Sequence, residues 1–311
     1  MKKLLTAILL ALLPMSAMAW QPKGPVTVII GYGPGSGNEI LFRKIDSIIA
    51  QQPNAPKFVL DFKPGANELI GTNVFSQSKN DGQTLFVPSI GVWLVSPVWY
   101  KKTIVQDPVE WIPVISLAET PLALYAANSS SVSTPKQFIE KLKSGDRVNV
   151  ATGAGVHMLA YQYIIQTTRA RDSQLIQYNS PAAVANAVAG GQVEFGITPL
   201  SMALEMSKAG KLKIIGITGT SKVNNIPLLN EYIKGLNLVG QVGIMLPKDT
   251  PPEIVAYYRT LFQSAVATRE FQDFVKDITW YDTLKTPQAY QMFINDERKK
   301  WLPIVQKLNV N

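Results

Sequence analysis

The sequence predicts an α/β fold of two domains, each built on a mostly parallel sheet with helices on its faces. Strand-like and helix-like segments alternate over residues 26–87, which is typical of a parallel sheet. A unit of strand, glycine-rich loop and helix opens this half of the chain, and a second such unit opens the other half. The length of 311 residues is also more than one hydrophobic core usually supports.

Residues 1–19 are predicted to form a signal peptide that is cut near Ala19-Trp20. Two lysines precede an apolar run over residues 4–13, and small residues stand at the expected cleavage site. The run is too short for a membrane anchor, which needs about 18 apolar residues. The sequence has no Cys for a lipid anchor. The mature protein is therefore expected to be exported and soluble.

The first glycine-rich loop spans residues 31–39, between a predicted strand at 26–30 and a helix with Leu41 and Ile45 on one face. Glycine lets a ligand approach the backbone, and the first N–H groups of a helix point at whatever fills the loop. Such a site suits a carboxylate, sulfate or phosphate. The loop does not match a P-loop, a dinucleotide-binding loop or a nucleophile elbow. The alternative is a turn that only connects strand and helix.

Two further loops are expected at the same edge of the first sheet. Strands are predicted at 57–62 and 83–87, on either side of a helix at 69–78. In parallel sheets, ligands bind beyond the carboxyl ends of the strands. The loops at 63–68 and 88–91 should therefore converge with the first glycine-rich loop. The segment from Trp93 to Pro121 is predicted to be irregular.

The second glycine-rich loop, residues 152–156, follows a predicted strand at 148–151 and precedes a helix at 157–167. Two helix N-termini that face each other across a cleft could hold one anion, although this loop too could be a plain connection. The other predicted elements are strands at 122–126, 192–198, 211–218 and 239–246, and helices at 135–142, 182–189, 199–210, 251–268 and from 287 onward. The chain crosses between the halves near 121–127 and 239–246, which predicts a two-strand hinge.

The composition excludes several kinds of site. Because the sequence has no Cys, disulfides and thiolate metal sites are excluded. His157 is the only histidine, so only this residue could serve as the base of a Ser-His-Asp relay. There are 30 Lys and Arg against 22 Asp and Glu, and the mature chain would keep a net charge of +6 without its two signal-peptide lysines. These basic residues form no stripe of the kind that binds nucleic acid, so the surplus favours anionic solutes.

Several short motifs stand in a fixed order along the chain. Residues 34–43 read P-G-S-G-N-E-I-L-F-R, residues 63–71 read K-P-G-A-N-E-L-I-G, and residues 81–85 read D-G-Q-T-L. Tyr178, the G-G-Q-V-E at 190–194 and the A-G-K-L at 209–212 follow. In order and spacing, this set resembles the solute-binding proteins of tripartite tricarboxylate transporters, also called the Bug family, along nearly the whole mature chain.

The resemblance implies a type II periplasmic-binding-protein fold, with two domains that each hold a mixed, mostly parallel sheet flanked by helices and are joined by a two-strand hinge. Domain 1 would comprise residues 20–121 and 247–311, and domain 2 residues 122–246. In this family, backbone N–H groups, hydroxyls and bridging water hold a ligand carboxylate. The implied ligand-binding residues are Tyr32, Gly35, Ser36, Gly37, Asn38, Asn67 and Ser89 from domain 1, and Thr152, Gly155, His157, Tyr178 and Thr198 from domain 2.

The sequence also departs from the family pattern. Asn67 and Glu68 replace a pair of glycines, Thr198 stands where an Asp is common, and the loop at 152–156 is about two residues shorter than usual. These departures predict a smaller, aromatic or partly neutral solute rather than a di- or tricarboxylate. Glu39, which stands where the family usually has Asp, is expected to order the helix N-terminus rather than touch the solute.

The chain is accordingly predicted to be a periplasmic, monomeric, non-enzymatic protein that captures a small organic anion, most simply a carboxylate, between its domains. It would deliver the anion to the membrane subunits of a tripartite tricarboxylate transporter. Two alternatives stay open at this point: a ligand-sensing co-receptor for a sensor kinase, and a periplasmic hydrolase that depends on His157. No catalytic residue, metal, cofactor or nucleic-acid partner is predicted.

Overall fold

The computed structural model describes residues 20–308 except residues 154, 221 and 282–285, so the predicted signal peptide lies outside the described residues. The strands are β1 (Val26–Ile30), β2 (Phe58–Phe62), β3 (Thr84–Val87), β4 (Ile112–Ala127), β5 (Val148–Thr152), β6 (Ser173–Gln177), β7 (Phe195–Pro199), β8 (Leu212–Ile217) and β9 (Val239–Leu246). The helices are α2 (Gly37–Ile49), α3 (Leu69–Ser76), α4 (Gly91–Leu94), α5 (Ser96–Trp99), α6 (Pro135–Ser144), α7 (Val156–Thr168), α8 (Pro181–Ala189), α9 (Leu200–Lys208), α10 (Pro252–Val266), α11 (Arg269–Asp277) and α12 (Pro287–Val305), with 3-10 turns at Pro108–Glu110 and Leu229–Glu231.

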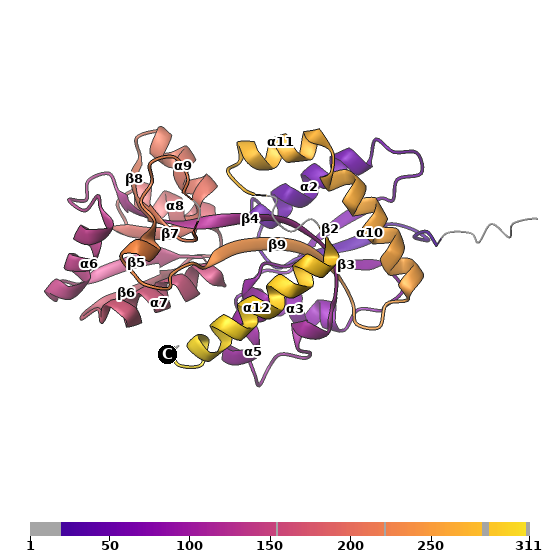
Figure 1. Ribbon diagram of the computed structural model, residues 1–311, viewed down its shortest axis with the longest axis horizontal. Helices are drawn as coiled ribbons and strands as arrows, with labels where there is room; N and C mark the ends of the chain where they lie inside the picture. The colour runs from indigo at the N-terminus through magenta and orange to yellow at the C-terminus, as the bar shows by residue number, and fades with distance from the viewer. Residues whose placement is uncertain (1–19, 154, 221, 282–285, 309–311) are drawn as a thin grey trace, which may run out of the picture.

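Two groups of parallel strands are joined by two long antiparallel strands. The strand order is β2-β1-β3-β9-β4-β7-β5-β6, and β8 pairs with β4. β1 is parallel to β2 and β3, and β5 is parallel to β6 and β7. β4 and β9 are antiparallel and run side by side from one group to the other (Figure 1). We call β1–β3 with α2–α5 and α10–α12 the first lobe, β5–β8 with α6–α9 the second lobe, and β4 with β9 the hinge.

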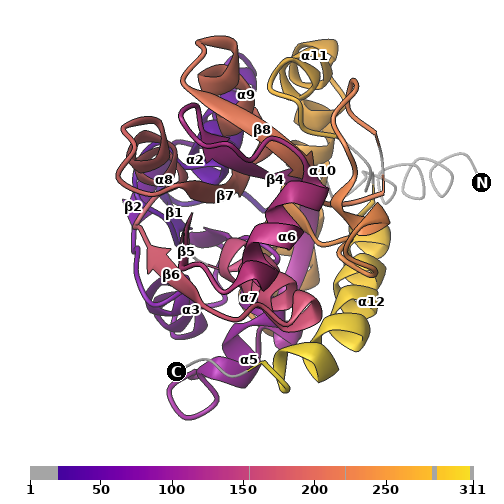
Figure 2. The ribbon, with the colours of Figure 1, turned by 90° about the vertical axis from the view of Figure 1, so that its left-hand side faces the viewer.

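Helices cover both faces of the sheet because its strands alternate their apolar side chains. In β1, Val28 and Ile30 pack in a cluster with residues of α2, α10 and α11, whereas Ile29 faces the cluster that holds Phe86. In the second lobe, β4 turns Tyr125 toward α8 and α9, and Leu124 toward α6 and α7. Figure 2, which looks onto the second lobe, shows these two pairs of helices on opposite sides of the strands.

Capping residues set several helix starts. A Ser or Thr side chain accepts a backbone N–H in the first turn of α2, α6, α8, α11 and α12. In α6, α8 and α12 a proline follows the cap, where its missing N–H costs nothing. These are the signals that predicted α6, α8 and α12 from sequence, and all three predictions are confirmed.

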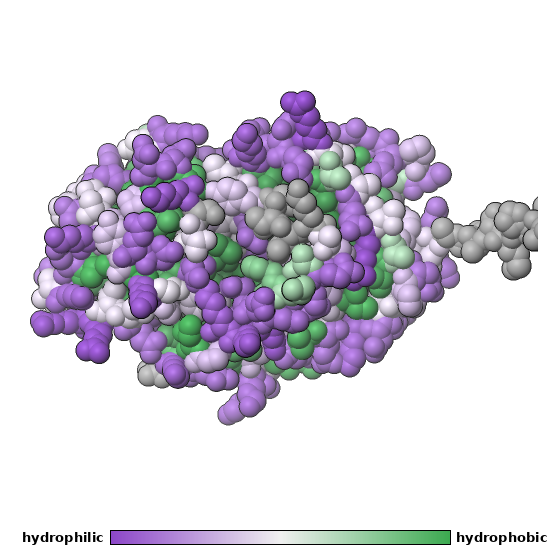
Figure 3. Space-filling model, in the orientation of Figure 1, coloured by the Kyte–Doolittle hydropathy of each residue, from purple (hydrophilic) through white to green (hydrophobic). Residues whose placement is uncertain are grey.

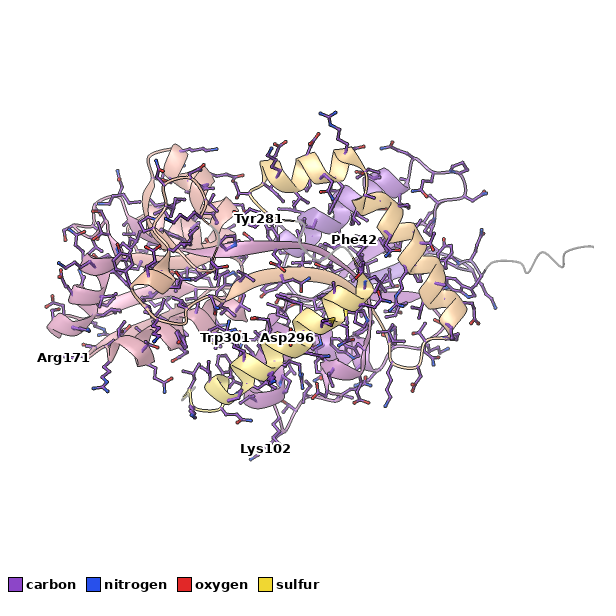
Figure 4. All side chains as sticks on the ribbon, viewed as in Figure 1. Phe42, Lys102, Arg171, Tyr281, Asp296 and Trp301 are labelled. Carbon is purple, nitrogen blue, oxygen red and sulfur yellow. The ribbon has the colours of Figure 1, made fainter. Side chains whose placement is uncertain are left out.

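Helix α12 packs against both lobes. Its Tyr290 ring lies 6.3 Å from the Trp93 ring of α4, and its Trp301 ring lies 5.3 Å from the Tyr163 ring of α7. Trp301 is labelled on this helix in Figure 4. Tyr290 and Trp301 are both fully buried, and they belong to one apolar cluster that extends through both lobes. The last helix therefore braces the two lobes on the side opposite α8 and α9.

Two predictions about the fold are wrong. The segment from Trp93 to Pro121 is not irregular, because it contains the helices α4 and α5 and the first ten residues of β4. Pro113 and Pro121 argued against a strand, since proline cannot donate to a ladder. The strand forms because it pairs with β9, more than 100 residues away in sequence, and the ladder shifts register between Pro113 and Ile115. The predicted helix at 251–268 also ends earlier, at Val266, and α11 follows it.

Three further observations concern the hinge, the length of the helices and the polarity of the surface. The predicted two-strand hinge is present, but β9 pairs with residues 112–121 of β4 rather than 121–127, because residues 122–127 already pair with β7 and β8. The exact domain boundaries stay a prediction. Within the described part of the chain, no helix is both long and apolar enough to cross a membrane. The face seen in Figure 3 is mostly hydrophilic, and its apolar residues lie in small separate groups.

Candidate functional site

The N-terminus of α2 is built by the first glycine-rich loop. Ser36 caps the helix by accepting the N–H of Glu39 at 3.4 Å. The carboxylate of Glu39 accepts the N–H of Gly35 at 2.7 Å and pairs with Arg43 Nε at 2.6 Å, so Glu39 orders the helix start, as predicted. Asn38 Nδ2 donates to the carbonyl of Val87 at 2.8 Å and fixes this turn to the end of β3.

The N-terminus of α7 lies against the first lobe. Gly155 caps α7 with a φ of +64°, which favours glycine. Its N–H donates to Asn67 Oδ1 of the first lobe at 2.9 Å. Gly91, the first residue of α4, is so close that an added Cβ would lie 3.1 Å from Gly155 Cα. The two lobes are thus in direct contact beside the helix starts.

Trp280 forms a second contact between the lobes. Its Nε1 donates to Ser201 Oγ of α9 at 3.3 Å. The next residue, Tyr281, exchanges two backbone hydrogen bonds with Glu119 of β4, at 2.7 and 2.8 Å. Figure 4 shows Tyr281 below α11 and beside the hinge. This bridge holds the Trp280 ring in place between the lobes.

A cavity that opens to solvent lies between the lobes and the hinge. Its lining comprises Tyr32, Ser36, Gly37, Asn38, Ser89 and Trp280 from the first lobe, Val156, His157, Pro181 and Pro199 from the second lobe side, and Thr120, Gly240, Gln241 and Val242 from the hinge. Four helices, α2, α7, α8 and α9, begin at or next to lining residues. None of the described lining residues is Asp, Glu, Lys or Arg. The positive ends of helices therefore dominate the field in the cavity, which favours an anion.

The structure brings six of the twelve predicted site residues to this cavity. They are Tyr32, Ser36, Gly37, Asn38, Ser89 and His157. Asn67 and Tyr178 line an adjoining pocket that also contains Tyr32, and Gly35 lines a neighbouring groove with Trp280. Gly155 stands at the lobe contact, and Thr152 and Thr198 are fully buried and line none of these three pockets. Contact of any of these residues with a ligand stays a prediction.

Sequence reasoning missed the hinge residues of the site and Trp280. The clearest signal was Gln241, a polar residue inside the apolar run of β9. It is fully buried, and its Nε2 donates to the carbonyl of Val242 at 2.6 Å and to Ser116 Oγ at 3.1 Å. Its Oε1 has no hydrogen-bond partner among the described residues. Gln241 and Gly243 lie on the same face of β9, and an added Cβ at Gly243 would meet the Tyr290 ring, so the Gln241 side chain lies on the α12 side of the strand, near the Tyr290 hydroxyl.

Glu68 places a buried carboxyl group next to the cavity. The residue has a φ of +69°, and Ala66 and Asn67 before it are also left-handed, so three successive non-glycine residues are strained. Glu68 Oε2 accepts the N–H of Ser89 at 3.1 Å, and Oε1 accepts the Ser89 hydroxyl. Burial raises the pKa of Glu68 to about 8, although hydrogen bonds from Ser89 and Tyr32 oppose the rise. Burial and the nearby Glu68 also raise the pKa of Tyr32.

We expect stability to fall as Glu68 is made to ionise. The folded protein holds this proton up to a pH of about 8, whereas the unfolded chain releases it near 4.5. The stability contributed by the raised pKa is complete below pH 4.5 and is lost as pH rises toward 8. The side chain in Glu68→Gln cannot titrate. From pH 5 to pH 8, the unfolding free energy of the parent protein should therefore fall further than that of Glu68→Gln, by at least about 1 kcal/mol. Urea denaturation at both pH values measures this, and equal losses in the two proteins would contradict it.

Comparison with known proteins agrees with this architecture. The family model described as "Tripartite tricarboxylate transporter family receptor" matches residues 41–310. A UPF0065 protein of Bordetella bronchiseptica is 26% identical over 259 residues, which are 81% of this chain and 76% of the relative. The structure of a periplasmic transporter has a TM-score of 0.85 at 22% identity, over 94% of this chain and 99% of the other. MatC from Rhodopseudomonas palustris with bound malate has a TM-score of 0.82 at 20% identity, over 92% of this chain and 100% of its own. The predicted periplasmic-binding-protein fold is confirmed.

Proposed function

Because the chain belongs to the tripartite tricarboxylate transporter receptor family, we propose that it is a periplasmic protein that captures a small organic carboxylate between its lobes. It hands the carboxylate to the membrane subunits of a tripartite transporter. The observation that supports this proposal is the cavity between the lobes, which the first turns of α2 and α7 enter from opposite sides. The protein binds one solute at a time, acts as a monomer and catalyses no reaction.

The carboxylate is held by backbone groups. The N–H groups of Gly37 and Asn38 lie in the first turn of α2 and have no acceptor within the helix. Val156 and His157 stand in the first turn of α7 on the other side of the cavity. One carboxylate between these two turns neutralises two positive helix ends without a salt bridge.

Ligand binding and closure of the lobes are linked. The carboxylate touches the first lobe through α2 and the second lobe through α7, so it binds the closed arrangement more tightly than an open one. Thr120 of β4 and Gln241 of β9 line the same cavity, so a bound ligand also contacts the two strands about which the lobes move. A transporter that recognises the closed lobes would then receive only loaded protein.

The proposal predicts that an organic acid stabilises the fold. In a thermal-shift screen of mono- and dicarboxylates, amino acids and aromatic acids, a true ligand at 100 times its Kd should raise the unfolding free energy by about 2.7 kcal/mol. The variant Gly37→Val should lose this response, because a Cβ there would lie 2.8 Å from the Trp280 ring and would push it into the cavity. Gly24→Val, where a Cβ meets nothing within 4 Å, is the matched control. A screen without any stabilising acid, or an unchanged response in Gly37→Val, would reject the proposal.

A further inference from the structure

We propose that Trp280 is a specificity-determining residue: its ring forms one end wall of the cavity between the lobes and limits the ligand to a compact organic acid. This inference rests on the proposed function and specifies which acids the site admits. It follows from how the ring is held between the lobes and from the groove that adjoins the cavity at the ring. Removing the ring should therefore lengthen the site.

The Trp280 ring spans the gap between the two lobes. On the first lobe it lies against the start of α2, where a Cβ added at Gly37 would be 2.8 Å from Cζ2 and 3.0 Å from Cη2. Its Nε1 donates across the gap to Ser201 Oγ of α9 at 3.3 Å. Trp280 is only 5% exposed and belongs to the apolar cluster of the first lobe. The ring is therefore a fixed part of the closed cleft.

The backbone that carries the ring is fixed on both sides. Before it, Thr279 has a φ of +59°, which is a costly conformation for a β-branched residue. The Trp280 N–H donates to the carbonyl of Val275 in α11 at 2.9 Å. After it, Tyr281 is joined to Glu119 of the hinge by two backbone hydrogen bonds. The wall is thus anchored to the hinge as well as to α11.

A groove adjoins the cavity at the Trp280 ring. The cavity and the groove share four lining residues from the two lobes, Gly37, Pro181, Pro199 and Trp280, which mark a constriction between them. Gly37 has no side chain, and the small rings of Pro181 and Pro199 stand at the starts of α8 and α9. Among these shared residues only Trp280 has a large side chain. Its ring therefore decides whether the cavity ends at the constriction.

The groove itself suits the apolar end of a longer acid. Ile40, Met202 and Ile278 line it and offer hydrocarbon surface. Glu205 also lines it, and its carboxylate would repel a second carboxylate there. An acid that passes the constriction should therefore enter the groove with an uncharged end, which makes straight-chain monocarboxylates the suitable probes.

The cavity also adjoins a polar pocket, but contacts between the lobes close that passage. Among the described residues, this pocket shares only Tyr32 with the cavity. Tyr32 is 6% exposed, and its hydroxyl would lie only 3.0 Å from a Cβ added at Gly155. Beside it, Asn67 of the first lobe accepts the Gly155 N–H at 2.9 Å. A longer ligand therefore gains more room at Trp280 than at Tyr32.

A chain-length series tests this inference by calorimetry at pH 7. Straight-chain monocarboxylates of two to ten carbons are titrated into the parent protein and into Trp280→Ala. In the parent, each buried methylene should strengthen binding about 4-fold until the chain meets the ring, and longer acids should bind more weakly. In Trp280→Ala the rise should continue for at least two more carbons. An acid two carbons beyond the parental optimum should then bind the variant at least about 10-fold more tightly than the parent.

Two further variants separate loss of the wall from loss of stability. Trp280→Leu keeps an apolar side chain in the cluster of the first lobe and should move the optimum in the same direction by at least one carbon. Tyr257→Ala removes an aromatic ring from a surface pocket that shares no described residue with the cavity, and should keep the parental optimum. A general loss of stability cannot produce tighter binding of a longer acid.

Equal optima in the parent, Trp280→Ala and Trp280→Leu overturn the inference and leave the proposed function standing. A parent protein whose affinity still rises at ten carbons has the same consequence. If the parent binds no monocarboxylate of the series, the inference also fails. The proposed function fails with it only when the dicarboxylates, amino acids and aromatic acids of the thermal-shift screen also give no stabilisation.

Discussion

Replacing Gly91 with Leu is expected to weaken ligand binding at least about 100-fold while the protein still folds. A Cβ at this position would lie 3.1 Å from Gly155 Cα and 3.2 Å from Val156 N, so it meets backbone of the other lobe rather than a flexible side chain. Backbone atoms cannot move aside unless the lobes separate. When the lobes are apart there is room for the leucine. The substitution should therefore raise the free energy of lobe closure and leave the folding of each lobe unaffected.

The size of the effect follows from the population of closed protein. The apparent Kd rises in proportion to the loss of the binding-competent state, and about 2.7 kcal/mol against closure corresponds to a factor of 100. Overpacking of this kind typically costs about 1–3 kcal/mol for a few added methylenes, and Leu adds four heavy atoms at the contact.

Calorimetry with a stabilising acid measures the affinity, and small-angle scattering measures the shape. Gly91→Leu should stay extended when the acid is added, whereas the parent protein should become more compact. Gly24→Leu, at an exposed position with open space around it, is the matched control and should behave like the parent. If Gly91→Leu bound the acid with parental affinity, contact between the lobes at Gly91 and Gly155 would not be part of the bound state.

The starts of α2 and α7 could be predicted because their signals are local. A β-branched strand, a run of glycines and a capping residue lie within 15 positions of one another, and together they determine where the helix begins and where its N–H groups point. Parallel topology then places both loops at the carboxyl ends of their strands, which predicts that they converge. The structure does bring Ser36, Gly37 and Asn38 to the same cavity as His157.

The rest of the site depends on pairing between distant segments. Thr120 and Gln241 reach the cavity only because β4 and β9 form a ladder across more than 100 residues of sequence, and no local pattern reveals this register. The sequence did mark Asn67 and Glu68 as departures from the family pattern. It could not show that Asn67 bonds to Gly155 in the other lobe or that Glu68 is bonded to both the backbone N–H and the hydroxyl of Ser89. Those contacts depend on three successive left-handed residues, and although Asn67 tolerates this conformation, the chemistry of Ala66 and Glu68 disfavours it.

A second large effect is expected on stability when Gly243 of the hinge strand β9 is replaced by Val. A Cβ there would lie only 2.5 Å from Tyr290 Cζ, well inside van der Waals contact. Tyr290 is fully buried and belongs to the cluster in which α12 packs against the hinge, so its ring has no free space to enter. We expect the free energy of unfolding in urea to fall by at least about 3 kcal/mol, at the upper end of the usual cost of overpacking.

The cause can be isolated by shrinking the opposing side chain. Tyr290→Leu removes the ring atoms that an added Cβ would strike, at the cost of a cavity in the same cluster. In that background, Gly243→Val should cost less than about 1 kcal/mol, which gives a coupling energy of about 2 kcal/mol between the two positions. A full cost for Gly243→Val in the Tyr290→Leu protein would place the strain elsewhere in β9. A small coupling would then mean that α12 is not pressed against the hinge, and that the brace across both lobes is weaker than the buried rings of Tyr290 and Trp301 indicate.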